Sequence, residues 1–400
     1  MHKVLLNRFC LQVKIHAEEP LLVKEPSPSD EEGKAAQKRR KEEGEPDMLF
    51  VRIARHQRLE PHIPGSSLKG PLRAYAERMV RTIIPGGACD PFDFNNNCSS
   101  RIEKISGDGQ GTGGDSRFVA GTDDGGERLT AYALSCPVCK VFGNAGLRAR
   151  LEVDDAYLDL GIEREIPQPA PAIHEGLVDV PWWWDKGAWD KSVSKACYLD
   201  FRTRIAVDRF TGGVRETGPF SMEYWKRGEP FVTRFTLRNF ECWQIGLLAF
   251  LLRDINEGYL KVGYGKSAGF GRIRVEPEYL TVTYYGKAAQ SAKKNQLDGV
   301  GKLCGEKDRK NYCFDEQDFI ELTGGIGGEP QNGLPYQKTV AVEREIPAGG
   351  QSGEPQNGLP YQKTFAYQAE EEIPEILKKA AEKWIAYAQE LKEMRPLDHG

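Results

Sequence analysis

One segment, Ile63-Pro-Gly-Ser-Ser-Leu-Lys-Gly-Pro-Leu-Arg73, constrains the fold of this chain more than any other. Its first proline and first glycine end the preceding strand, a serine can cap the helix that follows, and the composition from Leu72 onward is helical. Hydroxyls, cations and the N–H groups of a helix start therefore meet near one point, which suits a phosphate group. The side chains concerned are Ser66, Ser67, Lys69 and Arg73. An ordinary capped helix with surface cations has the same pattern.

A glycine-rich segment at 262–275 is the second constraint. Its Gly-Lys-Ser triplet is similar to part of a P-loop, but that motif requires a glycine where Leu260 stands and a helix after the triplet. The residues after Gly269 have the composition of a strand instead. We therefore expect a glycine turn that packs closely against backbone and opens a basic strand. The residues of interest are Gly263, Gly265, Lys266, Ser267, Gly269, Gly271 and Arg272.

Nine cysteines indicate thiols or metal ligands rather than disulfides, if the chain is cytoplasmic. Cys136-Pro-Val-Cys139 has the spacing at which two thiolates bind one tetrahedral zinc ion, and Cys89 and Cys98 can supply the other two. Such a structural zinc site would stabilise a region with few apolar residues. The alternative is that the first pair are core thiols and the second pair incidental.

Other residues bear on the metal prediction. A histidine could replace one cysteine ligand, and the candidates are His56, His62 and His174. Three further cysteines lie in apolar runs and are expected in the core: Cys10, Cys197 and Cys242. Two have no obvious partner: Cys304 and Cys313.

Composition limits the class of protein. The 400-residue chain has a formal net charge of −4, and its acidic residues gather in expected loops while many arginines lie in the motifs. We interpret this pattern as a basic groove on a mildly acidic body. No apolar run is long enough to span a membrane, and the N-terminus does not read as a signal peptide. We expect a cytoplasmic protein with no membrane partner.

Composition also divides the chain into regions. Residues 24–46 are rich in Pro, Ser, Glu and Lys and are expected to form a mobile loop. Residues 85–140 contain a loop-rich lobe held by the zinc site. Residues 161–198 form a tryptophan-rich insertion, whose rings could stack on bases, fill a small core of the insertion or contact another subunit.

The last region, 276–400, is expected to be a C-terminal extension. It contains two identical twelve-residue copies, at 328–339 and 353–364, which are too few for a solenoid. They are either two equivalent docking segments or a duplication. The chain then predicts an amphipathic helix at 376–394 that packs on this chain or on a partner. Its apolar stripe is Leu377, Ala381, Trp384, Ala388 and Leu391.

Three groups of segments together resemble the RAMP superfamily, and more narrowly a backbone subunit of type III CRISPR effector complexes, for which a subtype III-D-like complex is one candidate. The resemblance covers about residues 1–275 apart from the insertions. The segments are His62–Gly70, then Cys136–Gly143 with Leu151–Tyr157, and then Arg202–Gly213 with the glycine loop at 263–271.

The resemblance implies an α+β fold with a ferredoxin-like (RRM-type) βαββαβ core, in which an antiparallel sheet carries helices on one face. Large insertions, the zinc-held lobe and a β-hairpin thumb at 200–240 would extend this core. The thumb would pair 202–208 with 231–240 and wedge into a guide–target duplex. Arg204 and Arg209 would contact phosphates, and Phe210 or Val214 would form the wedge.

The partners implied are CRISPR guide RNA, complementary target RNA and the other subunits of the effector. In the family a loop aspartate, shortly before the strand that leads to the 63–70 turn, cuts target RNA. Asp47 matches that position best and Asp30 is the second choice. Because the RNA 2′-OH supplies the nucleophile, one carboxylate and a catalytic Mg²⁺ are enough in principle. The loop is longer and more charged than the family pattern, and a solvated loop acid is the simpler reading.

Three other functions stay open. The chain could be a non-catalytic RNA-binding scaffold of the same complex. It could be a guide-processing ribonuclease, for which His16 and His62 are poor catalytic candidates. It could also be a zinc-held interaction module, which predicts no salt-dependent affinity for RNA.

Overall fold

The computed structural model describes residues 4–26, 46–55, 58–106, 130–159, 199–205, 207–208, 210–214, 220–226, 228–322 and 362–394, with a few isolated residues in 27–45. The expected mobile loop at 24–46 lies mostly outside these residues. The tryptophan-rich insertion at 161–198 and nearly all of the duplicated copies lie outside them as well.

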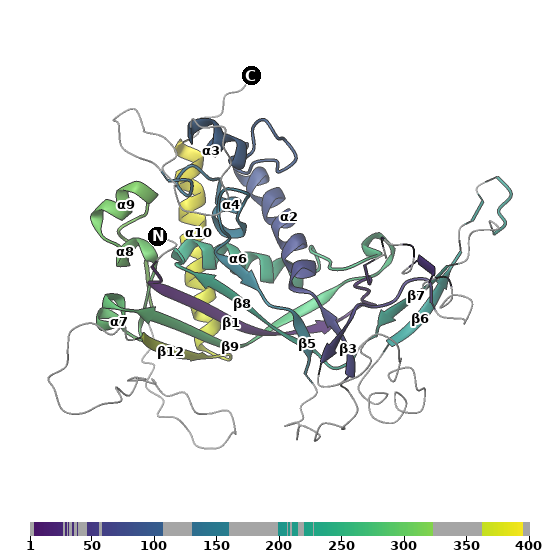
Figure 1. Cartoon of the computed structure of the whole chain (residues 1–400). Coiled ribbons are helices and arrows are strands. Elements are labelled where there is room, and N and C mark those ends of the chain that lie inside the picture. The colour runs from purple at the N-terminus through teal and green to yellow at the C-terminus, as the bar shows by residue number, and fades with distance from the viewer. Residues whose placement is uncertain are drawn as a thin grey trace, which may run out of the picture.

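A single large antiparallel sheet forms the body of the protein (Figure 1). Strand β1 (Asn7–Ala17) lies inside this sheet, and its side chains alternate strictly between buried and partly exposed positions, as in a strand with one face on the core. It pairs with β8 (Phe231–Arg238) on one side and β9 (Ile273–Tyr285) on the other. The full order is β12-β9-β1-β8-β5-β3-β2, and β4 also pairs with β8.

This order contains the predicted ferredoxin-like core. Along the chain come β1, α2 (Gly65–Ile83), β4 and β5 (Leu151–Val153, Ala156–Leu158), β8, α6 (Cys242–Asn256) and β9. In space the strands lie in the order β9-β1-β8-β5, with every pair antiparallel, as in a βαββαβ unit. The fold class inferred from the sequence is therefore confirmed.

Further strands and helices extend this core. One sheet edge is extended by β3 (Arg58–Ile63) and β2 (Arg52–Arg55), and the other by β12 (Gln362–Gln368). The remaining elements are α3 (Cys98–Ser106), α4 (Pro137–Phe142), β6 (Leu199–Arg204), β7 (Phe220–Trp225), the 3₁₀ turn η2 (Lys266–Ala268), α7 (Lys287–Ser291), β10 (Gln296–Asp298), α8 (Val300–Leu303), α9 (Glu306–Tyr312), β11 (Phe319–Glu321) and α10 (Glu372–Met394).

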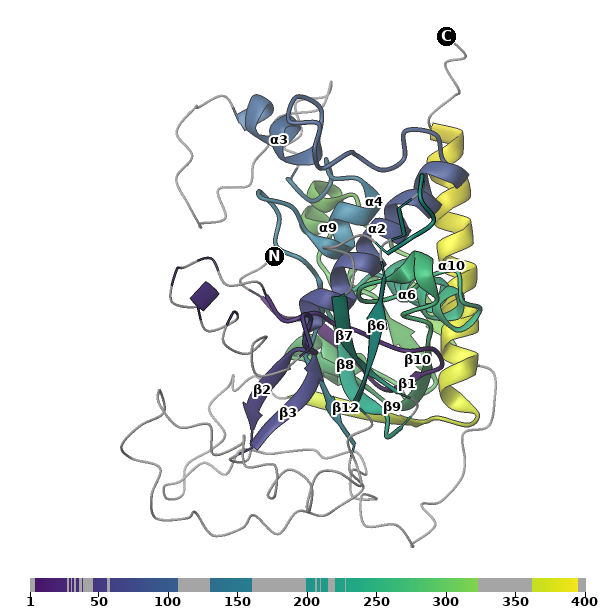
Figure 2. The same cartoon turned by 90° about the vertical axis from the view of Figure 1, so that its right-hand side faces the viewer.

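The C-terminal extension is part of the main core. The boundary expected after residue 275 falls inside β9, and β12 adds to the same sheet through β9. Helix α10 packs on α6, with Trp384 and Ala388 buried, while Ile373, Ile376 and Ala380 take the other fully buried places on its stripe. The predicted amphipathic helix therefore packs on this chain, against α6 (Figure 2).

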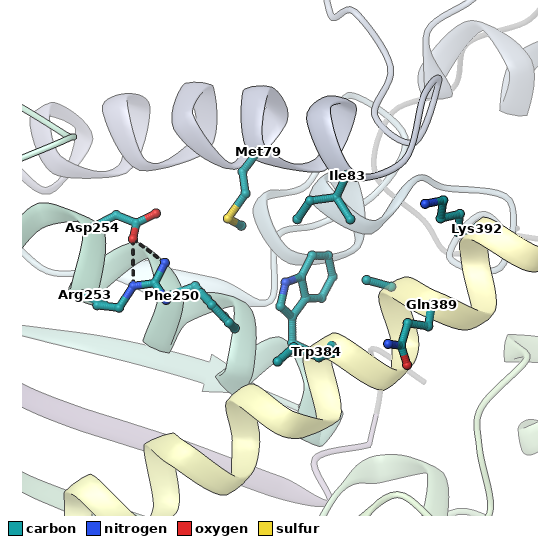
Figure 3. A pocket seen from close by; sticks show the side chains of 10 residues that line it. Met79, Ile83, Phe250, Arg253, Asp254, Trp384, Gln389 and Lys392 are labelled. Carbon is teal, nitrogen blue, oxygen red and sulfur yellow. Dashed lines mark hydrogen bonds and ion pairs between the residues drawn. The ribbon is translucent and has the colours of Figure 1, made fainter.

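The crossing of α6 and α10 depends on Gly246. A Cβ built at this position would lie 2.0 Å from the carbonyl oxygen of Ala380, which no side chain can do without moving one helix. Trp243 of α6 stacks on Tyr387 of α10, with ring centroids 4.3 Å apart, and adds an aromatic contact between the two helices. A small pocket, lined by residues that include Met79, Phe250 and Trp384, remains between α2, α6 and α10 (Figure 3).

One strand pairing differs from the prediction. Residues 231–240 were expected to form the second strand of the thumb, but β8 is a central strand of the main sheet. The reason is burial, because Phe231, Phe235 and Leu237 are at most 1% exposed. The thumb is instead the hairpin of β6 with β7, a separate two-stranded sheet.

We expect Gly246→Ala to destabilise the protein by about 1–3 kcal/mol, because the added methyl group overpacks the α6–α10 contact. Gly70→Ala is the control, since Gly70 is also helical and, apart from its chain neighbours, no atom lies within 4 Å of its Cβ position. That change should alter the stability by less than about 1 kcal/mol, because the gain in helix propensity is opposed by crowding from Pro71, which follows it. Urea unfolding measures both, and a similar effect of the two substitutions would contradict the described helix crossing.

Candidate nucleic-acid interface and metal centre

The β6–β7 hairpin projects from the body and carries exposed apolar side chains. It extends away from the main sheet at the end opposite α7 and α9 (Figure 1). Five large apolar residues on it are more than half exposed: Phe201, Ile205, Val207, Phe210 and Val214. A projecting element with a set of this kind is typical of a binding surface.

The hairpin tip presents Phe210 on an ordered turn. The Asp208 carboxylate accepts hydrogen bonds from the N–H groups of Phe210 at 2.8 Å and Thr211 at 3.0 Å. These bonds, with that of Thr211 the larger, lower the pKa of Asp208. Val207 and Val214 form an antiparallel bridge between the two segments that flank the turn. Phe210 is thus fully exposed at a defined place, whereas Arg209 lies outside the described residues.

The base of the thumb rests on Phe270 of the glycine loop. Phe270 is fully buried and lies edge-to-face with Tyr224 of β7, with ring centroids 5.7 Å apart. The guanidinium groups of Arg202 and Arg204 lie 5.7 and 4.9 Å from the Phe270 ring centre, within the range of cation–π attraction. Arg204 also donates a hydrogen bond to the carbonyl of Ala268 at 3.1 Å. The thumb and the glycine loop therefore form one unit.

The backbone just after β1 holds this unit to the sheet. Leu21 and Trp225 of β7 exchange two hydrogen bonds, at 3.0 and 2.7 Å. Leu22 accepts from the N–H of Tyr264 at 2.7 Å, and Pro20 accepts from the N–H of Gly271 at 2.9 Å. Residues 20–22, which we call the β1 exit, thus pair with the thumb and with the glycine loop at the same time.

The glycine loop has the close backbone contacts that the sequence predicts. Gly263, Gly265, Gly269 and Gly271 have φ angles of 82°, 73°, 81° and 89°, where glycine is favoured. A Cβ on Gly263 would lie 2.4 Å from the carbonyl oxygen of Leu22 in the β1 exit. No helix of P-loop type follows, since only the short turn η2 precedes β9. The prediction of a glycine turn that opens a strand is confirmed.

The start of α2 is less open than the sequence indicates. Gly65 donates its N–H to the carboxylate of Asp155 at 2.7 Å, and a Cβ on it would lie 2.1 Å from the carbonyl oxygen of Val153. This close approach explains why glycine stands there. Ser66 is exposed and Ser67 half-buried, so both hydroxyls lie at or near the surface of the first turn.

The two predicted cations of α2 are engaged within the fold. Lys69 donates to the carbonyl of Leu151 in β4 at 2.8 Å, and burial lowers its pKa. Arg73 donates to the Glu77 carboxylate at 2.9 Å and to the carbonyl of Gly143 at 3.0 Å. These contacts hold α2 to the β4 strand and to the segment after α4.

Exposed cations of α2, the glycine loop and the thumb share one region. Burial lowers the pKa of Lys266, and the second cause is the charge of Arg78 on α2. Both side chains are exposed, as is that of Arg202 on β6. Ser267 is exposed beside Lys266, whereas the exposed Arg272 pairs with Glu18 at 2.9 Å. Repulsion between cations of this kind is relieved when an anion binds.

Asp47 is anchored beside the thumb. Its carboxylate oxygen Oδ2 accepts from the N–H of Ser221 at 2.8 Å and from the Ser221 hydroxyl at 3.2 Å. The adjacent Met48 pairs with Met222 of β7. Sequence position alone placed Asp47 at the end of a loop, and the structure adds that this end is bonded to Ser221 of β7. Asp30 lies outside the described residues.

The four predicted cysteine ligands meet at one point. The sulfur atoms of Cys89, Cys98, Cys136 and Cys139 all lie within 4.8 Å of one another. Cys136 and Cys139 flank the first turn of α4, where the N–H of Cys139 bonds to the sulfur of Cys136. Among the described residues, this is the one group of three or more His, Cys, Asp or Glu side chains close enough to hold a metal ion.

The geometry fits a tetrahedral ion. With a metal–sulfur distance of about 2.3 Å, the edges of a tetrahedron are about 3.8 Å long. The sulfur of Cys89 lies 3.6 Å from that of Cys139 and 3.9 Å from that of Cys136. Both distances lie close to this edge length.

The other residues considered from the sequence lie elsewhere. His62 is buried, stacks on Tyr157 and has its pKa lowered by burial. His16 lies on β1, with Nε2 3.3 Å from the Glu276 carboxylate. Cys242 and Cys304 are buried, Cys10 is half-buried and Cys313 is exposed. His56, His174 and Cys197 fall outside the described residues. None of the described helices is long and apolar enough to cross a membrane.

Sequence reasoning missed three parts of the site. Phe270 stands between two glycines of the predicted loop, and this position was a signal that it anchors that loop. Tyr224 and the β1 exit carried no motif, because their role depends on which strands meet in space.

Comparison with known protein families gives one match. The model of the RAMP superfamily matches residues 14–274. This span begins in β1 and ends in β9, so it includes α2, the four cysteines, the thumb and the glycine loop. No curated protein matches the chain.

We expect Phe270→Leu to loosen the thumb selectively, because it keeps an apolar side chain but removes the ring contacts with Tyr224 and the two arginines. A loss of about 1–2 kcal/mol would speed amide hydrogen exchange in β6 and β7 roughly tenfold. Phe365→Leu is the control, since Phe365 makes a similar edge-to-face contact with Tyr284 at the far edge of the sheet. Unchanged exchange in β6 and β7 would show that Phe270 does not support the thumb.

Proposed function

We propose that this chain, which belongs to the RAMP superfamily, is a guide-RNA-binding backbone subunit of a type III CRISPR effector complex. The family itself suggests a CRISPR effector subunit that binds RNA and has the other subunits of the complex as partners. The observation that carries the narrower proposal is the unit formed by the thumb, the glycine loop and the β1 exit. The proposed function also implies a cytoplasmic location.

The surface of this unit has the chemistry that RNA requires. Cations at Lys266, Arg202 and Arg78 can contact phosphates, and the Ser66 and Ser67 hydroxyls offer further hydrogen bonds. The exposed Phe210 can stack on or separate bases at the hairpin tip. We therefore assign the phosphate contacts first to Lys266 and its neighbours, and not to Lys69 or Arg73, whose charged groups are bonded within the fold.

If Lys266 contacts a phosphate, Lys266→Ala should weaken RNA binding and lower the slope of log affinity against log salt by about 1. The measurement is fluorescence anisotropy with single-stranded RNA over a range of KCl concentrations. Lys307→Ala is the control, because Lys307 is exposed and belongs to α9, which lies at the opposite end of the protein from the thumb (Figure 1). Equal slopes for the wild type and both variants would contradict the proposed RNA face.

We also propose that the four cysteines bind a structural zinc ion. The sulfur geometry and the position of Cys136 and Cys139 around a helix start support zinc, since such sites prefer four thiolates in a tetrahedron. The ion would connect three segments: the loop of Cys89, the start of α3, and α4. Its role would be to fix the lobe that covers one side of α2.

Cys136→Ser should lose the metal and lower the melting temperature, because an alcohol is a much weaker zinc ligand than a thiolate. Zinc content by mass spectrometry should fall from about one ion per chain to near zero. Cys304→Ser is the control, as Cys304 is also buried but lies outside the cluster. Wild-type protein that purifies without zinc and does not take it up would refute the assignment.

We further propose that Asp47 takes part in cutting target RNA. The 2′-oxygen would attack the adjacent phosphorus, the bond to the 5′-oxygen would break, and the products would carry a 2′,3′-cyclic phosphate and a 5′-hydroxyl. Mg²⁺, when bound, would neutralise charge on the phosphate. The Asp47 carboxylate, held in place by Ser221, would accept the proton of the 2′-hydroxyl, and a proton from water would complete the 5′-hydroxyl.

A scaffold that binds RNA without cutting it is the second candidate. The observation in its favour is the anchoring of Asp47, because the two bonds to Oδ2 also explain the residue as a structural link between the 46–50 segment and β7. Both candidates use the same RNA face.

In the assembled complex, Asp47→Ala should abolish Mg²⁺-dependent cutting of labelled complementary RNA while changing its affinity less than about threefold, since the nearby phosphate contacts remain. Asp208→Ala on the thumb turn is a control carboxylate without a proposed chemical role. Cutting that survives Asp47→Ala would reject this residue. Tight binding with no cutting by the wild type would establish the scaffold.

A further inference from the structure

We propose that Arg73, Glu77 and Arg81 on α2 are positioning residues for the four-cysteine metal centre. They lie at i, i+4 and i+8 and so share one face of the helix. This inference deepens the proposed zinc site and rests on it. It assigns to Arg73 a role other than the phosphate contact that its sequence motif predicts.

Arg73 connects the helix to the pair of ligands around α4. Its Nη2 lies 3.8 Å from the sulfur of Cys139, its Nη1 donates to the carbonyl of Gly143 at 3.0 Å, and its Nε donates to Glu77 at 2.9 Å. Gly143 directly follows α4. The Arg73 guanidinium thus contacts the sulfur of the ligand Cys139, the residue that follows α4, and the Glu77 carboxylate on the next turn of α2.

Arg81 connects the same helix to the loop of Cys89. Its guanidinium donates to the carbonyls of Ala88 and Cys89. Glu77 lies between the two arginines, with its carboxylate 3.7 Å from Arg81, and its side chain is mostly buried. We call these three residues the α2 ladder. Through them one helix holds both the Cys89 loop and the α4 segment, whose ligands Cys89 and Cys139 are 50 residues apart in sequence.

The negative charge of the metal-filled site explains why arginine side chains lie beside it. Four thiolates around a divalent ion leave two negative charges in excess, in a place where three of the four cysteines are buried. Arg73 lies on Cys139, and Arg101 of α3 lies 3.5 Å from the sulfur of Cys98. These two cations compensate the excess, and backbone N–H groups bond to the sulfurs of Cys98 and Cys136. Such outer contacts lower the charge on sulfur and retain the metal.

The test uses the full chain loaded with zinc and the substitutions Arg73→Gln and Arg81→Gln. Arg78→Gln is the matched control on the same helix, since Arg78 is exposed and lies over the Tyr75 ring. Zinc transfer to a chromophoric chelator gives the rate of release. We expect release from both ladder variants to be roughly 10–100-fold faster than from the wild type and from Arg78→Gln.

A second readout separates contact with sulfur from general loosening. Cobalt(II) in place of zinc reports on the thiolates through its sulfur-to-metal charge-transfer absorption. Arg73→Gln should move this band to longer wavelength, because a sulfur without the guanidinium donates more charge to the metal. Arg81→Gln should leave the band in place, because Arg81 contacts two backbone carbonyls and the Glu77 carboxylate but no sulfur atom. Arg73→Lys keeps the charge and should fall between wild type and Arg73→Gln in both readouts.

The possible outcomes separate failure of the zinc site from failure of the α2 ladder. Wild-type protein that binds neither zinc nor cobalt overturns the zinc site and the ladder together. A zinc-loaded wild type whose release rate and cobalt band are unchanged in Arg73→Gln overturns the ladder alone. If Arg73→Gln does not fold, Arg73→Lys provides the test. A rate of zinc release and a cobalt band identical to those of the wild type would show that the several N–H donors of the guanidinium are not needed, which overturns the ladder.

Discussion

Backbone pairing at the β1 exit is the contact on which the rest of the candidate site depends. Residues 20–22 bond to the last residue of β7 on one side and to the glycine loop on the other. β1 itself is held between β8 and β9, whose residues lie more than 200 positions further along the chain. The sheet therefore fixes the β1 exit, and the β1 exit fixes the thumb. Phe270 then completes the contact from the loop side.

Helix α2 connects the two chemical regions of the protein. Its exposed Arg78 lies near Lys266 of the glycine loop, while its Arg73 and Arg81 contact the metal centre. Cations at nearby positions on one helix thus have different tasks, which depend on the side that each one faces. This arrangement explains why a cation-rich motif can belong to an RNA-binding family while some of its cations are bonded within the fold.

The sequence predicted the parts of the fold that local patterns determine. The spacing of apolar residues predicted α10, and the glycines at 263–271 predicted a turn that opens β9. The Cys136-Pro-Val-Cys139 spacing correctly indicated a cluster, because two ligands on one helix start need no tertiary information. The partner strand of the thumb was predicted wrongly. Both β7 and β8 alternate apolar and polar residues, and only the competition for the buried sheet places β8 inside.

The most direct test of the account is to map where RNA touches the protein. Guide complexes assembled with the full chain would be cross-linked with ultraviolet light, digested and analysed by mass spectrometry. The account predicts cross-linked peptides from the β6–β7 hairpin, centred on Phe210, and from the glycine loop around Lys266. Cross-links confined to the opposite end, at α7 and α9, or no cross-links to this chain in a complex that holds RNA, would contradict it.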